Sequence, residues 1–181
     1  MDRSVTARPH PHQTPLCASH PCDSEHRMKF ADLLKPAAVK VMQSATSKKR
    51  LLHSAADLAS GAYGIDTDRA FNALMERESL GPTGVGHGIA LPHARLEGLE
   101  SVVGVFLLVE KPVDFDSVDR LPVDLCFALL APEDAGVAHL KALALVSRSL
   151  RDAKLCAKLR ANPDVAKLYT ILTEAEADRA A

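Results

Sequence analysis

The chain has 181 residues, a formal net charge of -1, 47% hydrophobic residues and no tryptophan. This length is enough for one compact domain with a sizeable core. A near-zero net charge gives no general attraction to nucleic acid or anionic membranes, and 4% aromatic residues leave little material for stacking on bases. The dense basic cluster at residues 48–50 is short and fits the solvated first turn of a helix. We therefore expect no binding to nucleic acid.

The sequence lacks the apolar segments of membrane and secreted proteins. The longest apolar runs, residues 102–109 and 125–131, fall far short of the roughly 20 residues that a membrane helix needs. Prolines and histidines interrupt the N-terminal region, where a signal peptide would be continuously apolar. Cys126 and Cys156 lie inside apolar segments, as small buried side chains do in a reducing compartment. We expect a soluble cytoplasmic protein with no membrane insertion.

Residues 1–27 differ in composition from the rest of the chain. They are rich in proline, histidine and serine and show no hydrophobic periodicity, which predicts a disordered tail. Their histidines and two cysteines suggest a metal site, but no paired C-x-x-C spacing supports one, so we expect neither a metal nor a cofactor. Met28 is an alternative start. The domain is expected to span residues 28–173, followed by a short tail at 174–181.

Two helices are predicted in the first part of this domain. Ser47 can cap the first helix, which carries a periodic apolar face and closes at Gly61 or Gly64. Asp66 or Thr67 starts the second helix, and a Gly-Pro pair ends it.

Extended segments follow at residues 88–91, 102–109 and 121–130. The last two are nearly continuous apolar runs, which are typical of strands covered on both faces.

The C-terminal part of the domain reads as three further helices. Asp134 opens the first, Asp152 caps a short second one, and Asn162 followed by Pro163 begins the last. The inner stripe of the first of these helices is expected to consist of Val137, Leu140, Leu143, Ala144 and Val146. This order of elements predicts a single-domain α/β fold in which helices flank a central sheet on both faces.

The most informative stretch is residues 77–95, which read RESLGPTGVGHGIALPHAR. Glycines this dense let the backbone turn tightly and bring N–H groups close to an anion, which suggests a phosphate cradle. Its members would be Thr83, Gly84, Gly86 and Gly88. Two nucleotide-binding patterns do not fit. The P-loop requires lysine where His87 stands, and the dinucleotide fingerprint requires glycine where Ile89 stands.

The exit from this loop presents a histidine. Pro92 fixes its own backbone and favours an extended Leu91, so His93 emerges from a stiff segment. An imidazole with the ordinary pKa of about 6.5 is largely neutral near pH 7 and keeps a nitrogen lone pair. It can attack a phosphoryl group directly, and the reactive phosphorus–nitrogen bond suits onward transfer. On chemistry alone, a loop histidine without a role is the alternative.

Three motifs stand in order along the chain. They are an R-E-x-L-G-x-T-G-x-G-x-G-I-A-[IL]-P-H block at residues 77–93, a P-V-D-L-x-F-A-L-L run at 122–130 and an H-L-x-x-L helix at 139–143. Together they resemble the enzyme IIA family of the phosphoenolpyruvate-dependent phosphotransferase system, of the fructose/mannitol type. Within it the sequence is most similar to the nitrogen-related branch, IIANtr. The resemblance implies the family's fold, one α/β domain around a mixed sheet.

The resemblance also implies a set of site residues. His93 would carry the phosphoryl group on Nε2, with Nδ1 held by a hydrogen bond, and His139 and Arg77 would be the second histidine and the arginine of the site. A guanidinium can bind phosphoryl oxygens bidentately, and a histidine N–H can stabilise the charge of a loose transition state. From the residues alone, Arg77 could be a surface helix charge and His139 a hydrogen-bonded core histidine.

The chain departs from the family's pattern at two positions. Many relatives carry Asn at His87 and Ser or Thr at Pro82. His87 either joins the site or points to solvent, and solvent is favoured. Pro82 stiffens the loop and removes one N–H that could face phosphate. Neither substitution touches His93, so partner preference is affected rather than transfer.

Three functions are compatible with these residues. The first is a regulatory phosphotransfer component, which the resemblance implies receives phosphate from an HPr-like phosphocarrier protein and regulates nitrogen- or potassium-related target proteins. The charge of the added phosphoryl group would repel partners that dock on an apolar face made of Val85, Ile89 and Leu91. The second is the IIA component of a fructose/mannitol-type sugar permease that passes phosphate to a IIB domain. The third is a nucleotide- or phosphate-binding module without a covalent step.

Overall fold

The structure is a computed structural model that describes residues 27–175. The predicted tails lie almost wholly outside this range, as do the histidines and cysteines considered for a metal site. In chain order the elements are α1 (Phe30–Leu33), β1 (Leu34–Ser44), α2 (Lys48–Tyr63), α3 (Thr67–Ser79), β2 (Gly84–Gly86), β3 (Ile89–Ala90), β4 (His93–Leu96), β5 (Val103–Val113), β6 (Val123–Pro132), α4 (Gly136–Leu150), α5 (Ala153–Arg160) and α6 (Val165–Glu174).

Six strands of the described range form one mixed sheet in the order β1-β5-β6-β3-β2, and β4 pairs with β6 beyond the end of β3. β1 is parallel to β5, and β3 and β4 are both parallel to β6. β5 and β6 are antiparallel, as are β2 and β3. β5 and β6 lie at the centre, and their long runs of buried apolar residues are those of strands covered on both faces.

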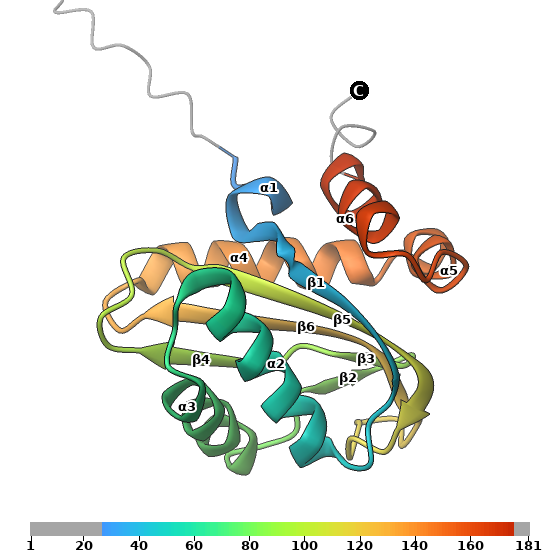
Figure 1. The fold of residues 1–181 in the computed structure, drawn as a ribbon, viewed down its shortest axis with the longest axis horizontal. Helices are drawn as coiled ribbons and strands as arrows, with labels where there is room; N and C mark the ends of the chain where they lie inside the picture. The colour runs from blue at the N-terminus through green and yellow to red at the C-terminus, as the bar shows by residue number, and fades with distance from the viewer. Residues whose placement is uncertain (1–26, 176–181) are drawn as a thin grey trace, which may run out of the picture.

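Helices cover both faces of this sheet (Figure 1). In this view α2 and α3 lie in front of the strands and α4 passes behind them. α2 contacts β1 and β5, α3 contacts β4, α4 contacts β6, and α6 packs on β1. The predicted single-domain α/β fold around a mixed sheet is confirmed.

Several predicted helix boundaries are confirmed by their hydrogen bonds. The side chains of Ser47, Asp66 and Asp152 each accept from backbone amides in the first turn of α2, α3 and α5. Gly64 ends α2 in the left-handed conformation, with φ of 71°, which glycine adopts without steric cost. Short polar side chains and one glycine thus fix these ends locally.

Other boundaries differ from the prediction. Asp164 rather than Asn162 caps α6, because its carboxylate reaches the N–H of Lys167. α4 begins at Gly136 without a side-chain cap, so Asp134 does not open it.

Strand β1 is absent from the predicted elements. It contains Pro36 and shifts register against β5 between Leu34 and Val39. The sheet tolerates this proline because β1 lies at its edge. There the missing N–H does not interrupt the hydrogen bonds between central strands.

The predicted inner stripe of α4 is wrong. Val137 and Leu140 are 68% and 66% exposed, and of the five expected residues only Val146 is buried. The buried side of α4 instead consists of His139, Ala142, Leu145, Val146, Ser149 and Leu150. Because α4 has apolar residues on more than one side, hydropathy alone did not identify the side that packs on the sheet.

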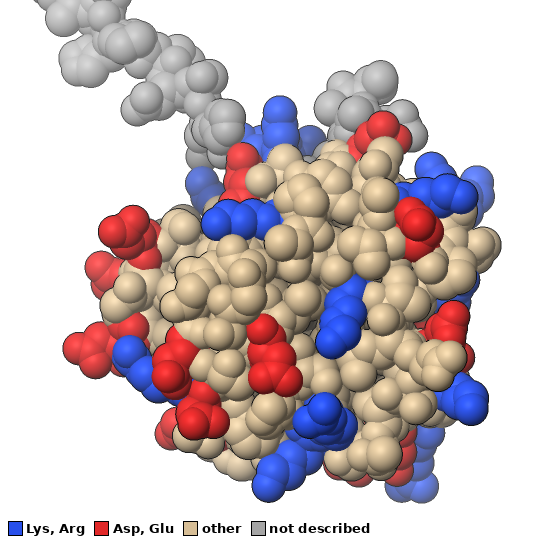
Figure 2. Space-filling model, in the orientation of Figure 1, with Lys and Arg blue, Asp and Glu red and all other residues tan. Residues whose placement is uncertain are grey.

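On the face drawn in Figure 2, acidic side chains gather toward the left, and basic side chains are spread over the centre, the bottom and the right, so no single sign covers the face. No helix within residues 27–175 is long and apolar enough to cross a membrane. Cys126 and Cys156 are buried, as predicted, and burial raises the pKa of the Cys126 thiol to about 12.

Candidate functional site

His93 is the first residue of β4 and pairs with Leu129 of β6. Its Nδ1 lies 2.9 Å from the carbonyl oxygen of Leu91. A carbonyl oxygen can only accept, so the hydrogen of the neutral ring is on Nδ1, and Nε2 keeps its lone pair. Arg77 Nε donates to this Nε2 over 3.1 Å. The backbone turn at Pro92 therefore selects the tautomer in which Nε2 is the nucleophilic nitrogen.

Arg77 lies in the last turn of α3 and is half-buried. Besides its bond to His93, its Nη1 donates to the carbonyl oxygen of Gly81 over 3.1 Å. The guanidinium thus joins the end of a helix, the start of the glycine loop and the imidazole. This placement does not support the alternative that Arg77 is only a surface helix charge.

His139 lies in the first turn of α4 and is 6% exposed. Its ring stands edge-on to that of His93, with centroids 5.7 Å apart and an interplanar angle of 66°. Its Nε2 is buried and has no hydrogen-bond partner among residues 27–175. A hydrogen-bonded core histidine would have such a partner, and an oxygen bound at His93 could supply one.

The site favours neutral imidazoles. Burial is the largest cause that lowers the pKa of His93 below its ordinary value. The hydrogen bond to Leu91 partly opposes it, the charge of Arg77 lowers the pKa further, and Glu78 raises it by the smallest effect. Burial also lowers the pKa of His139, and His93 and Arg95 add to this effect. Both rings are therefore more completely neutral at pH 7 than free histidine is.

This shift predicts a pH dependence. We expect the His93 ring to titrate below pH 6.5, so that it stays a neutral nucleophile as the pH falls through that value. Because the unfolded chain takes up this proton at higher pH than the folded chain, the same shift lowers folding stability as the pH falls below 6.5. An NMR titration of the ring protons, assigned with a His93→Ala variant, measures the midpoint. A midpoint at or above 6.5 would contradict the account.

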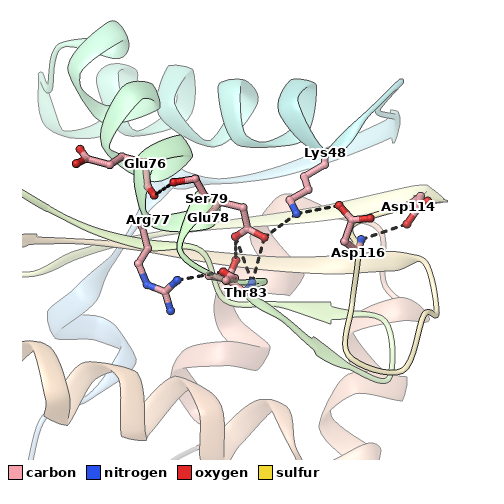
Figure 3. Close-up of polar contacts among 9 residues, drawn as sticks. Lys48, Glu76, Arg77, Glu78, Ser79, Thr83, Asp114 and Asp116 are labelled. Carbon is pink, nitrogen blue, oxygen red and sulfur yellow. Dashed lines mark hydrogen bonds and ion pairs between the residues drawn. The ribbon is translucent and has the colours of Figure 1, made fainter.

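Glu78, next to Arg77, is buried and is hydrogen-bonded to the glycine-rich loop at Thr83 (Figure 3). Its carboxylate accepts hydrogen bonds from the N–H of Thr83, at 3.1 and 3.2 Å, and from the Thr83 hydroxyl. Lys48 Nζ lies 2.8 Å from this carboxylate and 3.1 Å from that of Asp116. Burial alone would lower the pKa of Lys48, but the two carboxylates raise it above its ordinary value. Lys48 is therefore not the solvated charge expected from the sequence.

Replacing Glu78 by glutamine is expected to lower the free energy of unfolding by about 2 kcal/mol, because Lys48 loses its buried partner and Thr83 loses charged acceptors. Glu76→Gln, on the exposed side of the same helix, is the matched control and should change stability by less than about 0.5 kcal/mol. Urea unfolding followed by circular dichroism measures both. Equal destabilisation by the two variants would show that the buried pair contributes nothing.

The four residues expected to cradle phosphate lie along the loop and the β2–β3 hairpin. They are Thr83, Gly84, Gly86 and Gly88. A Cβ at Gly84 would lie 2.5 Å from Ser117 Oγ, and one at Gly88 would lie 2.7 Å from Asp124 Oδ1. Close packing thus explains these glycines without a ligand. Their phosphate-binding role stays a prediction that none of these contacts supports.

His87 and Gly88 form the two-residue turn between β2 and β3, both with positive φ, at 56° and 78°. Turns of this kind favour Asn followed by Gly, since Asn tolerates the left-handed region better than most residues. His87 occupies a position where asparagine would fit with less strain. Its side chain is exposed, as the favoured interpretation expects.

The apolar face expected around His93 is composed differently in the structure. Ile89 and Leu91 are buried at 4% and 6% exposure, and of the three expected residues only Val85 is exposed. The large exposed apolar side chains closest in sequence to Arg77 and His139 are Leu80, Val137 and Leu140. These exposed apolar residues lie just after α3 and in the first turns of α4, the helices that carry Arg77 and His139.

Sequence reasoning did not assign roles to Glu78 and Lys48. Both lie within quoted sequence features, the R-E pair and the basic cluster, but hydropathy gives no sign that either is buried. A carboxylate directly after the site arginine is a signal that could have suggested a structural ion pair.

Residues 32–175 match the family model described as phosphoenolpyruvate-dependent sugar phosphotransferase system, EIIA 2. This match spans most of the chain. The chain belongs to the EIIA 2 family.

Relatives of this EIIA 2 protein agree with that assignment. A nitrogen regulatory protein of Bradyrhizobium diazoefficiens is 44% identical over 145 residues, covering 80% of this chain and 95% of that protein. The nitrogen regulatory protein of Escherichia coli K12 is 37% identical over 155 residues, covering 85% and 95%. The structure of IIA-Ntr from Neisseria meningitidis superposes with a TM-score of 0.74 at 32% identity, over 80% of this chain and 99% of that one. The resemblance to the nitrogen-related branch is thus confirmed.

Proposed function

We propose that this EIIA 2 protein accepts a phosphoryl group on Nε2 of His93 from an HPr-like phosphocarrier protein in the cytoplasm. The observation that carries the proposal is the geometry of Nε2. It holds a lone pair, is contacted by Arg77 Nε at 3.1 Å, and belongs to a ring that packs edge-on against His139. Nε2 of His139, which has no hydrogen-bond partner within residues 27–175, supports a second contact to the incoming group.

The transfer step needs no cofactor. The Nε2 lone pair of His93 forms a bond to the donor's phosphorus while the donor's phosphorus–nitrogen bond breaks and its electron pair returns to the donor imidazole. The His93 ring gains positive charge, which the hydrogen bond from Nδ1 to Leu91 stabilises. Arg77 turns from Nε2 to the phosphoryl oxygens, where a guanidinium offers paired donors. The imidazole of His139 stabilises the charge on the equatorial oxygens of the transferring phosphoryl group.

The output of this step is regulatory. Phosphorylation adds about -1.5 to -2 charges, next to a surface on which Leu80, Val137 and Leu140 are exposed. Target proteins that dock through apolar contacts on this surface would be repelled by the dianion. The names of the relatives support nitrogen-related regulation, and we extend the proposal to nitrogen- and potassium-related targets.

A second candidate has one specific observation in its favour. The matching family model is described as part of a sugar phosphotransferase system, so the protein would instead pass its phosphate to a IIB domain of a fructose/mannitol-type permease. The same three side chains would serve. Sugar phosphorylation in extracts that contain or lack the protein distinguishes the two. Sugar phosphate that depends on the protein would favour the permease role.

Covalent labelling tests the proposal directly. The protein is incubated with labelled phosphoenolpyruvate, the general phosphotransferase and an HPr-type protein, and we expect a label that is acid-labile and base-stable, as a phosphorus–nitrogen bond is. Omitting the HPr-type protein is the control and should prevent labelling. No label under the complete conditions would support the third function, a phosphate-binding module without a covalent step.

A further inference from the structure

A cleft lies at the C-terminal end of α4, away from His139. Its volume is about 780 Å³, and its walls come from the β2–β3 hairpin, the start of β6, the last turn of α4, and α5. From His139 to Arg151 the helix rises about 18 Å. The cleft is therefore separate from the imidazole of His93, and its size is within the range of small-molecule sites.

One wall of the cleft is built by a charged pair. Arg160 Nε and Nη2 donate to the two carboxylate oxygens of Asp124 at 2.6 and 2.7 Å, and Nη2 also donates to the carbonyl oxygen of His87 at 2.8 Å. This guanidinium lies so close to Gly88 that a Cβ there would be 2.7 Å from Nη2. The bonds lock the hairpin against α5 and neutralise the carboxylate of Asp124.

The hairpin that lines the cleft is held in an unusual conformation. His87 has a φ of 56°, in the left-handed region that residues other than glycine seldom adopt. Asp119 accepts from its N–H at 2.7 Å, and Arg160 donates to its carbonyl oxygen. Two independent contacts thus fix the backbone of His87, which is one of the residues that line the cleft.

The charge of the cleft is set by Arg151. Arg151 is exposed and lines the cleft, and it forms no ion pair with any residue in the part of the chain that the structure describes. The carboxylate of Asp124 is already satisfied by Arg160. Around these groups the exposed lining is largely apolar, from Pro112, Leu121 and Pro122. One unpaired cation therefore faces a mostly apolar space.

We infer that this cleft binds a small organic anion, one with an apolar body and a single acidic group such as a carboxylate or sulfonate. The apolar body lies against Pro112, Leu121 and Pro122, and the acidic group is held by Arg151, with the His87 imidazole as a second donor. This inference does not depend on phosphoryl transfer.

A pair of dyes tests the inference. 8-Anilinonaphthalene-1-sulfonate has an apolar body with one acidic group, and N-phenyl-1-naphthylamine is the same body without it. In a fluorescence titration of the full chain we expect saturable binding of one sulfonate dye per protein, and binding of the neutral dye at least about tenfold weaker.

Matched variants locate the bound dye. Arg151→Gln should weaken binding of the sulfonate dye by about tenfold, and Ala153→Phe should abolish it by filling the cleft. Arg148→Gln, an exposed arginine of α4 that does not line the cleft, should leave it unchanged. His93→Ala should also leave it unchanged, which separates this outcome from the fate of the proposed function. Absence of saturable binding, equal affinity for both dyes, or equal effects of Arg151→Gln and Arg148→Gln would overturn the inference.

Discussion

His93→Ala is expected to reduce phosphoryl acceptance from roughly one group per chain to none. The reason is chemical rather than structural: Nε2 of this ring is the nitrogen that the site presents with a lone pair beside a guanidinium, and alanine removes it. Because the side chain is only half-buried, the fold should survive the change. The measurement is covalent labelling through the phosphoenolpyruvate-dependent chain, followed by intact mass.

Two other histidines provide controls for this variant. His87→Ala and His53→Ala alter exposed or partly exposed rings on the hairpin and on α2, and neither should change the amount of label. His139→Ala should slow labelling without abolishing it, since this ring stabilises charge but forms no bond to phosphorus. Full labelling of His93→Ala, or its loss in His87→Ala, would refute the assignment of the nucleophile.

Arg77→Gln is expected to slow phosphoryl acceptance about 1,000-fold, in the range lost when an arginine that neutralises phosphoryl charge is removed. Glutamine can still donate a hydrogen bond, but it carries no charge and has no paired donors to match the phosphoryl oxygens. Arg77→Lys should restore part of the rate, because lysine restores the positive charge but lacks the paired N–H donors of a guanidinium. Single-turnover kinetics with phosphorylated donor protein measure these rates.

The matched control for Arg77 is Arg69→Gln, on the same helix. Arg69 donates to the carbonyl oxygen of Glu97 and lies at the surface, so its loss should leave the rate within about twofold. If Arg77→Gln transferred as fast as Arg69→Gln, the guanidinium at His93 would have no part in transfer.

Much of the fold was predictable because its signals are local. Caps such as Ser47 and Asp66 accept hydrogen bonds from helix amides within three residues. The strands β5 and β6 are recognisable in the sequence because their apolar runs are too long for a strand with one exposed face. The sequence also indicated His93, because Pro92 stiffens the backbone from which the His93 ring projects. Its neighbours Arg77 and His139 needed the family resemblance, since they come from separate helices.

What the sequence did not predict depends on tertiary packing. Val137 and Leu140 look like core residues in a helix, but α4 turns its His139 side to the sheet and leaves them exposed. The glycines of the loop suggest an anion, but Gly84 and Gly88 are required by Ser117 and by the Arg160–Asp124 pair, which are distant in sequence. Glu78 gives no hydropathic sign of burial, and its partner Lys48 lies on another helix.

Nε2 of His93 is the atom expected to bond to phosphorus, and NMR of the phosphorylated protein tests this most directly. With ¹⁵N-labelled histidine, the account predicts that coupling to ³¹P appears at Nε2 of His93 and that Nδ1 keeps its hydrogen, bonded to the Leu91 carbonyl. Phosphorus coupled to Nδ1 of His93, or to a ring nitrogen of His139, would contradict it.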